Sequence, residues 1–111
     1  MNWNKLTEDN QLSEIKSLSK EMPVLIFKHS TRCSISSMAL ERLSRKWKEE
    51  DNEKIAPFYL DLISFRQLSD LVAREFGVPH ESPQLLVVKN GVAVYHASHF
   101  DISYADLFGK L

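Results

Sequence analysis

Apolar and polar residues alternate along this chain in blocks of two kinds. Short apolar runs rich in β-branched residues predict strands at 24–28, 55–62, 84–89 and 92–97. Apolar residues at a spacing of three or four predict helices at about 7–22, 34–50, 64–76 and 103–111. The predicted order is therefore helix, strand, helix, strand, helix, strand hairpin and helix.

Residues with known preferences at helix and strand ends mark the boundaries of these elements. Thr7 and Ser64 are suited to cap the first and third helices, and Pro23 stops the first. Gly77 is suited to end the third helix in a left-handed conformation. Asn90-Gly91 is a strong signal for a two-residue hairpin turn. The last two strands are therefore expected to pair with each other.

The apolar faces of the elements indicate how they pack. Both faces of strand 24–28 are apolar, which favours a central, parallel position in a sheet. In the second helix, a stripe at helical spacing is expected to face the core: Ile35, Met38, Ala39, Leu43 and Trp47. In the third helix, the corresponding stripe is Phe65, Leu68, Val72 and Phe76.

Composition narrows the class of protein. A length of 111 residues suits one domain, expected to span 1–111. The net charge is −1, whereas a nucleic-acid-binding domain is expected to be basic. No apolar run has the length of a membrane span, and the first residues lack the apolar core of a secretion signal. With one cysteine the chain cannot form an internal disulfide, which favours a cytoplasmic location.

The single cysteine, Cys33, lies where the first predicted strand gives way to the longest helix. Residues at the start of a helix lie beside unpaired backbone N–H groups and the positive end of the helix dipole. That environment favours the thiolate, which is the reactive form of cysteine. The alternative is a buried structural thiol, and the polar turn before Cys33 argues against it.

The positions of Cys33 and Pro83 add a family resemblance to this pattern. The chain resembles the thioredoxin-like α/β fold, a central mixed sheet flanked by helices, over nearly its whole length. The segment Gly77–Gly91 is similar to the cis-proline loop and hairpin of that superfamily. The resemblance implies that Cys33 is the active-site cysteine and that the Ser82–Pro83 peptide bond is cis.

The segment Lys28-His-Ser-Thr-Arg-Cys-Ser-Ile-Ser36 is more specific. Thioredoxins carry a second cysteine where this chain has Ser36. The segment is similar to that of the monothiol bacilliredoxins, the YtxJ-like proteins of the bacillithiol system. It departs from them at Arg32 and at Ser34, where family members often carry proline. The resemblance implies a thiol-disulfide oxidoreductase that removes bacillithiol from cytoplasmic proteins, with bacillithiol as co-substrate and no bound cofactor.

This chemistry assigns roles to the residues around the sulfur. Cys33 is the expected nucleophile, and Ser36 is expected to donate a hydrogen bond to its thiolate. Lys28 and Arg32 could bind the carboxylates of bacillithiol if both face the cleft. His29 is either a second group that tunes the sulfur or a solvated turn residue. The residues expected to bind substrate are Thr31, Arg32, Ser34, Ile35, Ser36, Ser82 and Pro83.

The expected partners are S-thiolated client proteins and a low-molecular-weight thiol, with no nucleic acid and no membrane. His96 and His99 lack a third well-spaced ligand, so no metal site is expected. Two other functions remain open from the sequence. One is a general glutaredoxin-like monothiol oxidoreductase that works with glutathione or another small thiol. The other is a catalytically silent thioredoxin-like module that binds proteins through the same groove.

Overall fold

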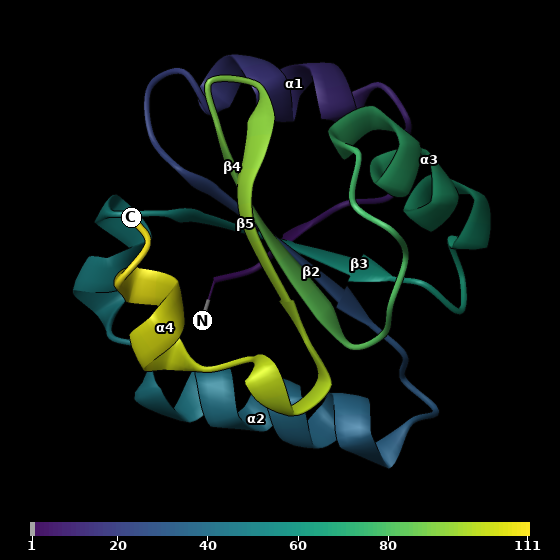
Figure 1. Ribbon diagram of the computed structural model, residues 1–111, viewed down its shortest axis with the longest axis vertical. Coiled ribbons are helices and arrows are strands. Elements are labelled where there is room, and N and C mark those ends of the chain that lie inside the picture. The colour runs from purple at the N-terminus through teal and green to yellow at the C-terminus, as the bar shows by residue number, and fades with distance from the viewer. Residues whose placement is uncertain (1) are drawn as a thin grey trace.

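A computed structural model describes residues 2–111 and shows a five-stranded mixed sheet flanked by helices (Figure 1). The strands are β1 (Asn4–Lys5), β2 (Val24–His29), β3 (Ala56–Asp61), β4 (Gln84–Lys89) and β5 (Val92–Ser98). The α-helices are α1 (Gln11–Leu18), α2 (Ser34–Lys46), α3 (Arg66–Phe76) and α4 (Tyr104–Phe108). Two 3₁₀ helices, η1 (Glu49–Glu53) and η2 (His99–Asp101), complete the order.

The strand order is β1-β3-β2-β4-β5. Strand β3 is parallel to both β1 and β2, whereas β4 is antiparallel to β2 and to β5. The predicted central position of the first long strand is confirmed, because β2 lies in the middle of the sheet with all six residues buried. The short edge strand β1 is an element that the sequence pattern did not predict.

The two faces of the sheet carry separate apolar cores. Helices α1 and α3 cover one face, and α2 and α4 cover the other (Figure 1). Because side chains of a strand alternate between faces, Val24 and Ile26 pack under α1 and α3. Leu25 and Phe27 pack on the opposite side, against α2 and α4. By the same alternation Lys28 continues the first series and His29 the second.

The predicted turns are correct, and two predicted helix caps are wrong. Gly77 ends α3 with a φ of 66°, and the Asn90-Gly91 turn has φ values of 51° and 79°. The helix α1 does not start at Thr7, whose N–H instead donates to the side chain of Gln11. Ser64 does not cap α3, because its hydroxyl donates to Asp61 at the end of β3.

The buried stripe of α2 differs from the one predicted. Ile35 and Met38 are 42% and 56% exposed, and the buried positions are Ser36, Ala39 and Leu43. The helix also ends earlier than expected, at Lys46. The chain then turns through η1, where Asp51 accepts hydrogen bonds from the backbone N–H of Lys48 and the hydroxyl of Tyr104.

These features place the cysteine loop and the proline loop at one edge of the sheet. Strand β2 ends there and β4 begins there, with Lys28 opposite Gln84 in the antiparallel register. Cys33 follows β2 by a short turn, and Pro83 directly precedes β4.

No helix within residues 2–111 is long and apolar enough to cross a membrane.

Candidate active site

Cys33 occupies the N-cap position of α2. Its backbone N–H donates to the carbonyl of Ser30 at 3.1 Å, which closes the turn between β2 and the helix. Cys33 is partly exposed, no side chain caps α2, and the first turn of the helix carries no acidic residue. The first N–H groups of the helix therefore keep their positive field for an anion at the cap, and a thiolate is such an anion.

Ser36 is completely buried one turn into α2, and its hydroxyl bonds to the end of β2. Its Oγ accepts a hydrogen bond from the N–H of Ser30 at 3.0 Å and lies 2.6 Å from Nδ1 of His29. When His29 is neutral and accepts at Nδ1, the single hydroxyl proton is used in that bond. The hydroxyl thus holds the loop that carries Cys33, in place of the bond to sulfur expected from the sequence.

His29 is the last residue of β2 and is buried, not a solvated turn residue. Its ring lies near those of Phe27 and Tyr59, with centroid distances of 6.4 and 5.6 Å. Burial lowers the pKa of His29 below its ordinary value of 6.5, and the nearby charge of Asp61 opposes that shift. The imidazole is therefore neutral at physiological pH, the form that accepts a proton from Ser36.

Lys28 does not face the cleft, which corrects the role suggested for it by sequence. Its side chain is fully buried on the α3 side of the sheet. The ammonium nitrogen lies 3.0 Å from the carbonyl oxygen of Ser69 and 3.3 Å from Nδ1 of His80. Lys28 is thus unable to bind the carboxylate of a ligand beside Cys33, and Arg32 alone keeps that role as a prediction.

The proline loop supplies the other side of the site. The Ser82–Pro83 peptide bond is cis, as the resemblance implied. The carbonyl of Pro83 accepts from the N–H of His99 at 3.0 Å, which joins the loop to the end of β5. Next to Pro83, the buried hydroxyl of Ser82 and the side-chain oxygen of Gln84 lack a hydrogen-bond partner among the described residues.

Other residues expected to bind substrate are open to solvent. Thr31 and Arg32 in the turn, and Ser34 and Ile35 at the start of α2, are all exposed. These four therefore remain available to a ligand at the sulfur.

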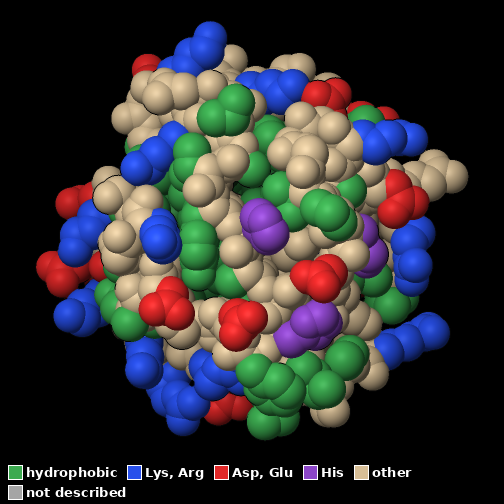
Figure 2. Space-filling model, in the orientation of Figure 1, with side chains coloured by type: hydrophobic (Ala, Val, Ile, Leu, Met, Phe, Trp, Pro, Cys, Tyr) green, Lys and Arg blue, Asp and Glu red, His purple; other side chains and the backbone are tan. Residues whose placement is uncertain are grey.

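An exposed apolar patch adjoins the cysteine loop, and we define it as Ile35, Met38 and Phe100. Ile35 and Met38 lie on the face of α2 whose Arg42 donates to the carbonyl of Ile102, and η2 packs beside α2. Phe100 of η2 is 75% exposed. Figure 2 shows hydrophobic side chains gathered at the lower edge of this view, over η2 and α2.

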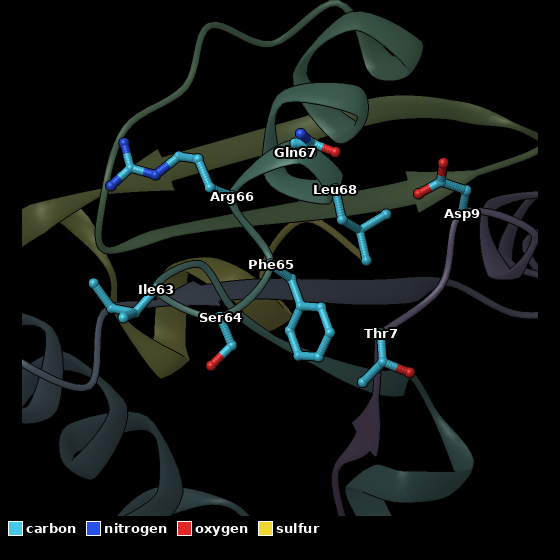
Figure 3. Close-up of a pocket in the computed structure, with 8 residues that line it drawn as sticks. All are labelled: Thr7, Asp9, Ile63, Ser64, Phe65, Arg66, Gln67 and Leu68. Atoms are coloured by element: carbon cyan, nitrogen blue, oxygen red, sulfur yellow. The ribbon is translucent and has the colours of Figure 1, made fainter.

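The hollow in Figure 3 is separate from this site. It has a volume of about 370 Å³ and is lined by residues of the N-terminal segment and the start of α3, among them Thr7, Asp9 and Phe65. Phe65 and Thr7 lie close together in the close-up, whereas Arg66 extends away from them. Neither Cys33 nor the proline loop lines this hollow. Within residues 2–111, no three His, Cys, Asp or Glu side chains are placed to hold a metal ion.

Comparison with known proteins identifies the family. The model of the monothiol bacilliredoxin BrxC family matches residues 4–107. The chain belongs to this family. It is also similar to a solved structure described as an inferred oxidoreductase with a thioredoxin fold, with 32% identity and a TM-score of 0.80. That match covers 96% of this chain and 90% of the other.

More distant structures confirm the thioredoxin-like fold. A thioredoxin from Malassezia sympodialis matches at 15% identity with a TM-score of 0.74, covering 97% of this chain and 86% of that one. Thioredoxin f from spinach chloroplast matches at 13% identity with a TM-score of 0.72, covering 97% and 82%. Membership of the bacilliredoxin family indicates that this thioredoxin-like chain has a thiol redox role.

Three features of this bacilliredoxin site were missed or undervalued from the sequence. They are the buried Lys28, the bond between His29 and Ser36, and the exposed Phe100. The alternation of faces along β2 is the available signal for the first two. Lys28 already lies within the predicted strand 24–28, whereas for His29 the strand must be extended by one residue, past the end of the apolar run.

The bond network at Ser36 leads to a stability prediction. Ser36→Ala is expected to lower the free energy of unfolding by about 1–3 kcal/mol, because the buried Ser30 N–H and His29 Nδ1 lose their partner. Urea unfolding at neutral pH measures the change. Ser37→Ala is the matched control, since the exposed Ser37 follows directly in α2. Equal stability of the two variants would contradict the assigned bonds.

Proposed function

We propose that the protein removes bacillithiol from S-bacillithiolated cytoplasmic proteins through a mixed disulfide on Cys33. The observation that supports this most is a single, partly exposed cysteine at an uncapped helix start, in a chain of the bacilliredoxin family. Ser36 stands where a resolving thiol would be, and its hydroxyl is bonded to His29 and Ser30. An internal disulfide is impossible, so an outside thiol must complete each cycle.

The reaction consists of two exchanges. The Cys33 thiolate attacks the bacillithiol sulfur of the client's mixed disulfide, and the client thiolate leaves and takes a proton from water. Cys33 then carries bacillithiol in disulfide linkage. A second bacillithiol thiolate attacks the bacillithiol sulfur, releasing bacillithiol disulfide and the Cys33 thiolate. The client is reduced, and the two small thiols are oxidised to one disulfide, so electrons balance.

The surroundings of the sulfur support binding of both substrates. The helix N–H groups and Arg32 suit the carboxylates of bacillithiol. The backbone at Ser82, next to the cis bond, is suited to pair with an extended client segment. The patch of Ile35, Met38 and Phe100 offers apolar contact to a client protein, while Thr31 and Ser34 offer hydroxyl groups.

The decisive experiment compares two modified forms of the same client. We expect the protein to strip bacillithiol faster than glutathione and to accumulate one bacillithiol per chain, seen by intact mass. Arg32→Ala should narrow this preference and weaken the effect of salt on the rate, because its exposed guanidinium is lost. Arg45→Ala, exposed near the other end of α2, is the matched control.

The other outcomes separate the remaining functions. Equal rates with both modified clients would favour a general monothiol oxidoreductase. Failure to remove either thiol, with the client still bound, would favour a silent binding module. In either case the proposed function would be wrong.

A further inference from the structure

A buried polar cluster lies under α3, and the thiol chemistry at Cys33 does not use it. Lys28, near the end of the central strand β2, and Ser69 of α3 are both fully buried. The lysine nitrogen is 3.0 Å from the Ser69 carbonyl oxygen and 3.3 Å from Nδ1 of His80, and the Ser69 hydroxyl is 3.2 Å from the same Nδ1. One amine thus joins a strand, a helix and a loop.

That loop, residues 79–83, begins three residues after the end of α3 and includes the cis peptide bond, and side chains hold much of it. Gln84, the cross-strand partner of Lys28, donates from its amide to the carbonyl of Pro79 at 3.0 Å. Ser98 bonds to the carboxylate of Glu81. The contact of His80 with Lys28 lies between these two, where it ties the middle of the loop to β2.

The charges around the cluster fit a lysine that donates to a neutral imidazole. Burial lowers the pKa of Lys28 to about 8, and the charge of Asp70 opposes this. Burial also lowers the pKa of His80, and the positive charges of Lys28 and Arg66 lower it further, against Asp70 and Glu81. A neutral His80 keeps a lone pair at Nδ1 for the lysine N–H.

We propose that Lys28 is a positioning residue: through His80 it fixes loop 79–83 as one wall of the groove beside Cys33. This inference rests on the proposed function, because the wall matters to activity only if a client binds there. Without the amine, His80 loses its bond to β2 and keeps only the contact with the Ser69 hydroxyl of α3. The backbone at Ser82 then loses a fixed place for the client segment.

The kinetic test uses Lys28→Met, which keeps the length of the side chain without its donors, and His80→Gln, a surface change that spares the core. Each variant is expected to raise KM for a bacillithiolated client by roughly five- to tenfold, the effect of about one hydrogen bond. The kcat and the rate of Cys33 alkylation by iodoacetamide should not change. The double variant should be no worse than either single one, and Lys20→Met, an exposed lysine, is the control.

Two measurements test the loop without relying on activity. In Lys28→Met, the titration of His80 followed by NMR should move upward, because a positive neighbour is lost. Amide exchange in residues 80–82 should become faster in both variants. If the wild type fails to transfer bacillithiol, the proposed function fails, while faster exchange still supports the role of Lys28 in the loop.

Three results would overturn the inference. One is unchanged amide exchange of the loop in both variants. Another is a KM that is the same in both variants as in the wild type, provided that the wild type does transfer bacillithiol. The third is a fall in kcat and in alkylation rate with KM unchanged, which would move the role of Lys28 to the sulfur itself.

Discussion

Cys33→Ser is expected to abolish transfer of bacillithiol to below detection. A thiolate is the nucleophile in thiol-disulfide exchange, whereas a serine hydroxyl does not attack a disulfide. The chain has one cysteine, so no other thiol can take over. The measurement is the release of bacillithiol from a modified client. Intact mass spectrometry of the enzyme should then show the bacillithiol adduct in the wild type and not in the variant.

A loss of activity in Cys33→Ser must be distinguished from a loss of folding. Serine is nearly the same size as cysteine, and Cys33 is partly exposed, so the free energy of unfolding should change by only about 0.5 kcal/mol. Ser17→Ala, an exposed change in α1 on the opposite face of the sheet, should leave the rate unchanged. Transfer by the serine variant at a rate comparable to that of the wild type would show that Cys33 is not the nucleophile.

The order of elements was predictable because it depends on local signals. Apolar runs, helical spacing, the αL glycine at Gly77 and the Asn90-Gly91 turn each act over a few residues. The central place of β2 followed from a strand that is apolar on both faces. The cis bond before Pro83 followed from the family resemblance, since no local signal marks it.

The errors arose where a distant or competing partner decided the outcome. The hydroxyl of Ser64 bonds to Asp61, and the side chain of Gln11 bonds to the N–H of Thr7, so neither expected cap forms. In α2, Met38 follows helical spacing, yet it is 56% exposed, because the buried face of the helix is the one that carries Ser36, Ala39 and Leu43. Such choices depend on the packed structure.

The polar residues after the apolar run of β2 show the same limit at the site. A lysine and a histidine at the end of an apolar run are typical of a turn, yet both are buried here. Each has a partner that is remote in sequence or in the next helix: Ser69 and His80 for Lys28, and Ser36 for His29. The sequence therefore located the cysteine, but the structure was needed to find what holds its loop and the facing wall.

The second large effect is expected in the pH dependence of stability. The pKa of Lys28 falls from 10.5 to about 8 on folding, because burial disfavours the charged form. Between pH 8 and 10.5 the unfolded chain therefore binds the proton more than the folded one does. By linkage, stability rises with pH across this window, and below pH 8 the folded state bears the full cost of the buried charge.

Lys28→Met removes this dependence, and the other groups that titrate are common to both proteins. The stability of the variant relative to the wild type should be greatest below pH 8 and decrease as the pH rises to 10.5. The decrease over the whole window should be about 3 kcal/mol, because each pKa unit corresponds to about 1.36 kcal/mol. Urea unfolding of both proteins at several pH values in this window measures it. A constant difference across the window would show that Lys28 titrates normally and that its burial does not control its charge.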